Sequence, residues 1–253
     1  MKMPVNRFKR DLSEQKTQIG LWSSTGSVAA VEMLGSAGYD WILLDTEHTP
    51  TELPDIIAQM RVLVDSQAEP IVRPAWNDVV LIKRFLDAGA RTLLIPFVQD
   101  EEEARRAVRA MRYPPHGVRG VSVSSRANRY GRIAEYFQRV HDELCLLVQI
   151  ETRAALERLE AIASVEGVDG IFIGPSDLAA DLGHLGSPSH PEVQAAIRSA
   201  AERCRAAGKA CGILAPVEED AKRYLGWGYG FVAVGADMGL LRGAADRLLE
   251  RFR

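Results

Sequence analysis

Two acidic side chains stand where two apolar segments of the chain end. Glu151 closes CLLVQIE (145–151), and Asp177 follows GIFIG (170–174) after two intervening residues. The segment between them carries apolar residues at helical spacing, which predicts a strand–helix–strand unit with a carboxylate at the carboxyl end of each strand. Neighbouring parallel strands end on the same side of a sheet, so we expect both carboxylates to face one mouth. Two hard oxygen ligands in such a place suit a divalent cation.

Further polar and aromatic side chains follow the other apolar runs. At the ends of the expected strands stand Trp22, Asp45, Glu47, His48, Arg73, Pro96, Gln149, Ser176 and Leu214. A helix cap or a surface ion pair would account for any one of the polar residues taken alone. Their collection at the same end of one set of strands predicts an active site.

The positions of the lysines argue against Schiff-base chemistry in this mouth. Lys83 lies inside an expected helix, and Lys209 precedes an expected strand and so lies at the opposite end. The remaining lysines are terminal or on the surface, so none reaches the mouth to act as a nucleophile. A metal held by Glu151 and Asp177 can polarise a carbonyl group instead.

The neighbours of these carboxylates favour a particular substrate. A helix is expected to begin behind Asp177, where the backbone N–H groups of Ser176 and Asp177 can receive a substrate carboxylate. Arg73 is suited to an enolate oxygen that gains charge, and His48 can move a proton. Together these groups predict a 2-oxo acid that becomes an enolate.

Eight apolar runs alternate with helix-periodic segments. The expected strands cover residues 18–24, 40–45, 69–74, 92–96, 145–151, 170–174, 210–214 and 231–235. This alternation predicts an α/β fold, a closed (β/α)8 barrel or TIM barrel, with residues 1–253 as a single domain. One stretch, Tyr113–Glu143, breaks the alternation with prolines, glycines and several arginines, and predicts either a solvated basic loop or a subunit interface.

The composition is that of an ordinary soluble protein, with 47% hydrophobic and 26% charged residues. A net charge of −3 gives no reason to expect a nucleic acid or an anionic membrane as partner. The three cysteines lack metal-type spacing, and their odd number argues against a disulfide framework, which indicates a reducing cytoplasm. No signal peptide or membrane span is expected.

A series of motifs runs along nearly the whole chain. In order they are LLDTEH, VRPAWND, IKRFLDAGARTLLIPFV, RYPPHGVRG, VQIET, VDGIFIGPSDLAADLGHLG, HPEV, GILA and FVAVGAD. Together they resemble the HpcH/HpaI aldolase family of metal-dependent (class II) pyruvate aldolases. The resemblance implies a barrel of the phosphoenolpyruvate/pyruvate superfamily type, a divalent cation (Mg²⁺, Mn²⁺ or Co²⁺) and a homo-oligomer, with a hexamer suggested. It also implies reversible retro-aldol cleavage of a 4-hydroxy-2-oxo acid, such as 4-hydroxy-2-oxoheptanedioate or a 2-keto-3-deoxy sugar acid, to pyruvate and an aldehyde.

The resemblance also implies roles for individual residues. His48 matches the catalytic base of the family, Arg73 the arginine that stabilises the transition state, and Asp87 the aspartate that raises the basicity of the histidine. Glu151 and Asp177 match the metal ligands. Substrate contacts are implied for Gln149 and for the segment Gly174, Pro175, Ser176 and Asp177. Trp22 and Leu214 are apolar residues at strand ends, which either wall the pocket for the aldehyde half or pack in the core.

Asp87 does not fit this scheme within one chain. It lies near the carboxyl end of its expected helix, at the face of a barrel away from the mouth. We therefore hypothesise that Asp87 completes the active site of a neighbouring chain, which would make oligomerisation necessary for full activity. The alternatives are an ion pair of Asp87 with an arginine such as Arg91, and Asp45 as the local residue that orients His48.

Two other classes of function stay open. A CoA-ester lyase or another metal-enolate lyase would use the same chemistry, although no segment resembles a CoA pocket. A non-catalytic binding protein would have no need of the set His48, Arg73, Glu151 and Asp177, so this set favours an enzyme.

Overall fold

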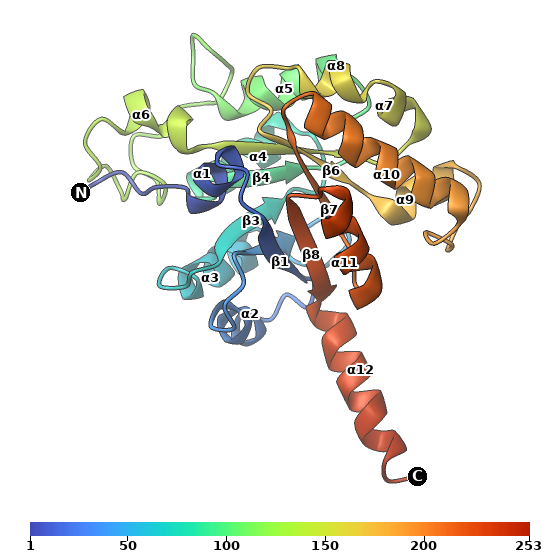
Figure 1. Cartoon of the computed structure of the whole chain (residues 1–253). Coiled ribbons are helices and arrows are strands. Elements are labelled where there is room, and N and C mark those ends of the chain that lie inside the picture. The colour runs from blue at the N-terminus through green and yellow to red at the C-terminus, as the bar shows by residue number, and fades with distance from the viewer.

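The computed structural model describes residues 1–253, and its centre is a closed barrel of eight parallel strands (Figure 1). The strands are β1 (Gln18–Ser23), β2 (Trp41–Asp45), β3 (Glu69–Arg73), β4 (Thr92–Ile95), β5 (Cys145–Ile150), β6 (Gly170–Ile173), β7 (Ala210–Leu214) and β8 (Phe231–Ala236). Each strand pairs with the next along the chain, and β8 pairs with β1. The predicted (β/α)8 barrel is confirmed, with every expected strand present to within one residue at each end.

Helices surround the barrel and connect its strands. They are α1 (Arg7–Ser13), α2 (Val28–Gly35), α3 (Leu53–Val62), α4 (Val79–Asp87), α5 (Glu101–Met111), α6 (Tyr136–Glu143), α7 (Arg153–Glu157), α8 (Leu159–Ala163), α9 (Pro175–Asp181), α10 (Pro191–Ala206), α11 (Glu218–Trp227) and α12 (Asp237–Glu250). The helix expected between β5 and β6 is instead a pair of short helices that meet at Arg158.

Helix α1 closes the end of the barrel where the strands begin. Asn6 caps the helix by accepting from the Lys9 N–H (3.0 Å), and its amide donates to the hydroxyl of Thr92 (2.9 Å), the first residue of β4. Phe8 is buried, and its ring packs edge-on against Phe231 with centroids 5.5 Å apart. This plug leaves the other end, where the strands finish, as the mouth of the barrel.

The insertion after α5 is built around a buried asparagine. Asn128 accepts hydrogen bonds from the backbone N–H groups of Ser125 (3.0 Å) and Gly131 (2.8 Å). Arg119 is fully buried, with its guanidinium 4.5 Å from the centroid of the Tyr113 ring. The reading of the insertion as a solvated basic loop is therefore wrong for Arg119.

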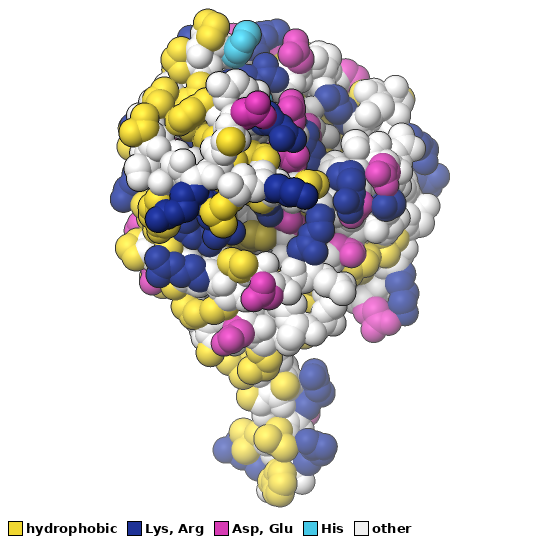
Figure 2. All heavy atoms as spheres, turned by 90° about the vertical axis from the view of Figure 1, so that its left-hand side faces the viewer, with side chains coloured by type: hydrophobic (Ala, Val, Ile, Leu, Met, Phe, Trp, Pro, Cys, Tyr) yellow, Lys and Arg dark blue, Asp and Glu magenta, His cyan; other side chains and the backbone are white.

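Helix α12 leaves the barrel instead of folding back against it. Figure 1 shows it extending alone from the end of β8, and Figure 2 shows hydrophobic side chains along its free surface. Its main contacts are with β1 and β8 at its first turn. Among its exposed residues are Met238, Leu240, Leu241, Leu248 and Leu249, followed by Phe252.

The base of α12 is tied to the loop after β1 by one buried carboxylate. Asp237 Oδ2 accepts from the hydroxyls of Ser23 (3.0 Å) and Thr25 (2.7 Å) and from the Thr25 N–H (3.1 Å). Its Oδ1 accepts from the N–H groups of Ser24 (2.9 Å) and Met238 (2.7 Å). The direction of α12 and the shape of a loop at the mouth therefore depend on the same side chain.

No helix is both long and apolar enough to cross a membrane. The three cysteines, Cys145, Cys204 and Cys211, are free and buried.

Candidate active site

A buried arginine binds two acidic residues at the mouth. Arg73, at the end of β3, donates from Nε to Asp45 Oδ1 (2.8 Å) and from Nη2 to Asp45 Oδ2 (2.7 Å). Its Nη1 lies 2.7 Å from Glu47 Oε2, although not in hydrogen-bond alignment. Burial acts to raise the pKa of Asp45, but the hydrogen bonds and charge of Arg73 outweigh it and hold that pKa below its ordinary value. Asp45 is therefore an ionised carboxylate paired with Arg73.

Two hydrogen bonds fix the orientation of Glu151. Its Oε1 accepts from the backbone N–H of Phe97 (2.9 Å), and its Oε2 accepts from the side-chain amide of Gln149 (2.7 Å). Phe97 has a φ of 53°, a left-handed conformation that is uncommon for a residue with a side chain. Backbone strain at Phe97 thus accompanies the N–H group that holds the carboxylate.

Three carboxyl groups, those of Glu47, Glu151 and Asp177, share the mouth. Burial raises the pKa of Glu151 to about 7, and the charges of Asp177 and Glu47 act in the same direction. Burial also raises the pKa of Glu47, where Asp45 and Asp177 add to the effect and Arg73 opposes it. Like charges in a buried site repel one another unless protons or a cation neutralise them. The donor set fits a divalent cation, because carboxylate oxygens are the ligands that such ions take.

Gly174 approaches Glu151 so closely that a side chain does not fit between them. A Cβ on Gly174 would stand 2.5 Å from Glu151 Oε2 and 2.9 Å from Glu151 Cβ. We expect Gly174→Ala to displace the carboxylate and to lower kcat on the order of 10²-fold, as small displacements of catalytic groups do. Gly226→Ala on α11 is the matched control, since a Cβ there meets open space. Equal kcat values for the two variants in a steady-state assay would refute the tight fit.

His48 stands at the rim, and its acidic neighbour is Glu47. The side chain is 65% exposed, and Nε2 lies 3.6 Å from Glu47 Oε1. Asp45 instead binds Arg73, the indole N–H of Trp22 (3.3 Å) and the backbone N–H of Glu47 (3.0 Å). In the structure the acidic neighbour of His48 is therefore Glu47, whereas Asp45 is paired with Arg73.

Asp87 lies at the end of α4, and its partner is Arg119. Its Oδ1 accepts from Nη2 of Arg119 at 2.6 Å. The alternative of an ion pair with an arginine is thus formed with Arg119, whereas Arg91 binds Glu69. Helix α4 runs back from the mouth after β3, so Asp87 is separated from the site that contains His48 of the same chain.

The segment expected to contact substrate lies at the start of α9. Gly174 is the N-cap of this helix, and Pro175, Ser176 and Asp177 form its first turn. The first N–H groups of a helix have no acceptor within the helix. Those of Ser176 and Asp177 can therefore face a ligand beside Glu151.

Trp22 and Leu214 at the mouth differ in burial: Trp22 is buried, whereas Leu214 is only partly buried. Trp22 is 5% exposed, with the guanidinium of Arg73 4.7 Å above its ring and the ring of Phe172 5.6 Å away. It forms the floor beneath Arg73 and belongs to the barrel interior. Leu214 is partly buried and packs against the same interior cluster. Leu214 is thus the one of the two with surface left for a ligand.

Sequence reasoning gave no role to two groups of the mouth. Glu47 lies two residues after Asp45 in the sequence. Which of these two carboxylates lies beside His48 depends on the position of Arg73. The role of the Phe97 N–H could not be predicted, because no sequence pattern indicates that a phenylalanine adopts a left-handed backbone conformation.

Comparisons with known proteins cover almost the whole chain. The family model for HpcH/HpaI aldolase/citrate lyase matches residues 18–244. Pyruvate aldolase from Rhizobium etli is 54% identical over 252 residues, which are 100% of this chain and 99% of that protein. 5-Keto-4-deoxy-D-glucarate aldolase from Citrobacter koseri is 52% identical over 248 residues, which are 98% of this chain and 96% of that protein.

A solved structure agrees with the fold. An HpcH/HpaI aldolase/citrate lyase family protein from Burkholderia cenocepacia is 38% identical and superimposes with a TM-score of 0.95, covering 98% of this chain and 100% of the other. The match to the family model includes every residue of the acidic mouth.

Proposed function

This chain belongs to the HpcH/HpaI aldolase/citrate lyase family and is a carbon–carbon lyase. We propose the following reaction for it. The protein cleaves a 4-hydroxy-2-oxo acid reversibly to pyruvate and an aldehyde, with a divalent cation as cofactor. The observation that carries the proposal is the group of three carboxyl groups, Glu47, Glu151 and Asp177, beside the buried Arg73. Excess negative charge supports cation binding, and a fixed guanidinium supports an anionic transition state.

Glu151 and Asp177 would hold the cation. Mg²⁺, Mn²⁺ and Co²⁺ all suit two carboxylates with open positions for substrate and water. When bound, the cation would polarise the 2-oxo group of the substrate and offset charge on the enolate. The hydrogen bonds from Phe97 and Gln149 orient Glu151 in advance. The other amide atom of Gln149, Oε1, is buried without a partner and is free to accept from a substrate hydroxyl.

His48 and Arg73 handle the proton and the developing charge. His48 takes the proton of the C4 hydroxyl while the C3–C4 bond breaks and the aldehyde forms. The electron pair of that bond passes into the enolate of pyruvate, and Arg73 offsets the charge that grows on the enolate oxygen. The N–H groups of Ser176 and Asp177 receive the substrate carboxylate. Protonation of the enolate at C3 then gives pyruvate. In the direction of synthesis, loss of that proton forms the enolate again, and His48 returns its own proton to the new hydroxyl.

The aldehyde half is the part of the substrate that the relatives help to define. One relative carries the name 5-keto-4-deoxy-D-glucarate aldolase, and another the name pyruvate aldolase. These names favour a keto-deoxy sugar acid over 4-hydroxy-2-oxoheptanedioate as the natural substrate. We assign Leu214, which is partly buried at the end of β7, to the wall beside the aldehyde half.

Removal of divalent cations is expected to abolish the activity. Chelator-treated protein should release pyruvate from a 2-keto-3-deoxy sugar acid more slowly by roughly 10²- to 10³-fold, because the enolate charge is no longer offset. Mg²⁺, Mn²⁺ or Co²⁺ should restore the rate in a coupled assay for pyruvate. Full activity in chelator would contradict the proposal. Failure with every 4-hydroxy-2-oxo acid, together with cleavage of a CoA ester, would favour the alternative CoA-ester lyase.

We also propose that α12 packs against a second copy of the chain in a homo-oligomer, with the hexamer of the family resemblance as its full form. Met238, Leu241 and Leu248 recur at helical spacing and are 51%, 68% and 50% exposed. Burying side chains of this kind contributes roughly 1 kcal/mol or more each. A projecting helix with an apolar stripe is typical of a segment that requires a partner surface.

In that assembly Asp87 acts on His48 of a neighbouring chain. His48 lacks an aspartate partner of its own, and Asp87 stands away from the mouth of its own barrel. The two observations support a site that is completed in trans.

Charged residues on the stripe of α12 are expected to yield monomers. Leu241→Glu combined with Leu248→Glu places two carboxylates where apolar contact is needed, so light scattering should give the mass of one chain. Activity should fall with assembly, because Asp87 is then lost from the neighbouring site. Arg242→Glu on the same helix is the control and should keep the wild-type mass. A wild-type protein that is monomeric and fully active would refute both proposals.

A further inference from the structure

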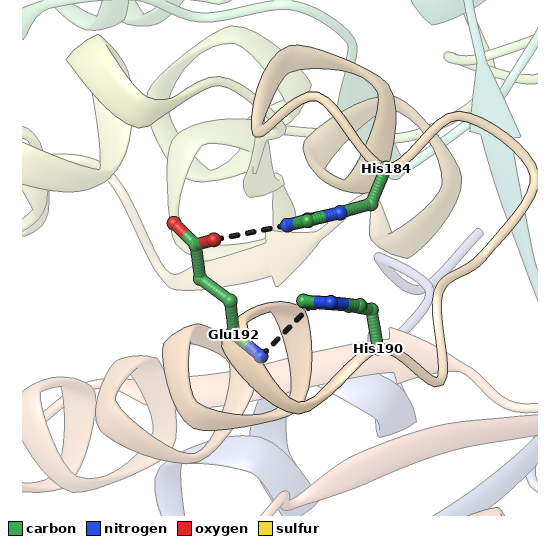
Figure 3. A group of neighbouring side chains, drawn as sticks. All are labelled: His184, His190 and Glu192. Carbon is green, nitrogen blue, oxygen red and sulfur yellow. Dashed lines mark hydrogen bonds and ion pairs between the residues drawn. The ribbon is translucent and has the colours of Figure 1, made fainter.

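Three side chains that can bind a metal gather where the loop after α9 meets the start of α10, outside the acidic mouth. His184, His190 and Glu192 each offer one ligand atom, and these atoms lie within 4.8 Å of one another (Figure 3). Nε2 of His184 lies 2.9 Å from Glu192 Oε2, and the two imidazole rings stack with centroids 3.5 Å apart. Two imidazoles and a carboxylate form a ligand set typical of Zn²⁺.

Backbone hydrogen bonds hold this loop in one shape. The His184 N–H donates to the carbonyl of Ala179 (2.7 Å), and the His190 N–H donates to that of Ser187 (3.0 Å). His190 is also the N-cap of α10, where its Nδ1 accepts from the Glu192 N–H at 3.3 Å. The backbone that carries the three ligands is thus held in place before any ion binds, which lowers the ordering cost of binding.

The carboxylate of the cluster already has two hydrogen-bond partners, His184 and Arg153. The hydrogen bond from His184, followed by that from Arg153 (Nη2 to Oε1, 3.0 Å), lowers the pKa of Glu192. Asp181 faces the same region and accepts from the Arg153 N–H at 2.7 Å. A metal ion would take the place of the hydrogen bond between His184 and Glu192, and Arg153 would keep the second carboxylate oxygen.

We propose that His184, His190 and Glu192 form a second metal site, for an ion of the Zn²⁺, Ni²⁺ or Cu²⁺ class, that clamps the α9–α10 loop to α10. Bonds of about 2.0–2.1 Å would place neighbouring ligand atoms of a tetrahedral ion roughly 3.3–3.5 Å apart. The present separations approach this once the stacked rings turn apart about their side-chain bonds. The side chain of Glu192 is 49% exposed and can adjust to the ion, whereas His184 is 23% exposed and has less freedom. Water would fill the remaining position.

The two sites differ in the kind of ion that they favour. The mouth offers carboxylates, which suit Mg²⁺ and Mn²⁺, whereas the loop offers mainly imidazole nitrogen, which suits Zn²⁺, Ni²⁺ and Cu²⁺. The loop ion would act on stability, because it would join the loop that follows α9 to the start of α10.

The test uses calorimetric titration with Zn²⁺ in a background that removes the first site, Glu151→Gln with Asp177→Asn. This background should bind one Zn²⁺ per chain at the loop and gain thermal stability on binding. Adding His184→Gln, which keeps a hydrogen bond to Glu192, should weaken binding more than 10-fold. His190→Asn should do the same, although asparagine preserves the cap of α10. His116→Ala is the control and should leave binding unchanged.

Co²⁺ provides a second measurement that does not depend on stability. Bound to the loop, it should give visible absorption bands that disappear in the His184→Gln and His190→Asn variants. The proposal is overturned if the background binds no Zn²⁺, or if the two histidine variants bind it as tightly as the control, which would indicate adventitious surface binding. Neither outcome depends on the aldolase reaction.

Discussion

Glu151→Gln is expected to lower the rate of pyruvate release on the order of 10³-fold and, at the same time, to stabilise the metal-free protein at neutral pH. The rate should fall because the proposed cation would lose one charged ligand, and cations of this kind contribute several kcal/mol to the stabilisation of an enolate. The fold is kept because the new amide oxygen can accept from Phe97, and the unpaired Oε1 of Gln149 can turn to accept from the new amide nitrogen.

The gain in stability follows from the pKa of Glu151. In the metal-free fold this pKa is raised to about 7 from an ordinary value of 4.5, first by burial. Between these pH values the folded state binds more protons than the unfolded state, so the free energy of unfolding falls as the pH rises from about 4.5 to about 7. The variant does not undergo this loss of stability and should be more stable than the wild type by on the order of 3 kcal/mol above pH 7.

Urea unfolding in chelator at pH 5 and pH 7.5 measures this difference. The wild type should lose stability between the two conditions relative to the variant. Glu218→Gln on α11 is the control, since that side chain is exposed and pairs with Lys222. Identical pH dependence in wild type and variant would show that Glu151 carries no unfavourable charge in the fold.

Arg73→Met should destabilise the protein by about 3–5 kcal/mol, because removing one partner leaves the other charge of a buried pair uncompensated. Asp45 is 2% exposed and would keep only the weak bond from Trp22 and one backbone N–H. Its pKa should rise, since burial would no longer be opposed by the guanidinium. Pyruvate release should fall on the order of 10²- to 10³-fold with the loss of the fixed positive charge.

Two further variants separate the structural effect of Arg73 from its catalytic effect. Arg73→Lys keeps the charge but cannot form the two parallel bonds to Asp45, so it should recover part of the stability and little of the activity. Asp45→Asn in the Arg73→Met background removes the unpaired charge and should recover stability without activity. Recovery of activity in that double variant would contradict a direct role for the guanidinium.

The barrel could be predicted because its strands are buried along their whole length. CLLVQI in β5 and GIFI in β6 are buried at every position, so each reads as a continuous apolar run bounded by polar residues. The rule that barrel sites form where strands end then directs attention to Arg73 and Glu151. Both lie at the mouth in the structure, and their catalytic roles stay predictions.

The remaining features depend on contacts that no local pattern encodes. Helix α1 buries only Phe8 and Leu12, too few positions to establish a period, yet these close the barrel. The partner of Asp87 lies 32 residues away in an irregular insertion. The neighbour of His48 depends on how Arg73 positions Asp45 and Glu47, and that arrangement forms only when β2 and β3 lie side by side.

Asp237 joins the base of α12 to the loop of Ser23, Ser24 and Thr25 beside the mouth. If α12 packs against a second copy of the chain, the Asp237 carboxylate would couple the position of α12 to the loop beside the mouth. The conformation of that loop would then depend on whether the second copy is bound. Turnover per chain would then rise with protein concentration, and dilution would act as an inhibitor. A small molecule that binds the surface on which α12 packs would inhibit catalysis without resembling pyruvate or any aldehyde. The inhibition would be non-competitive with substrate.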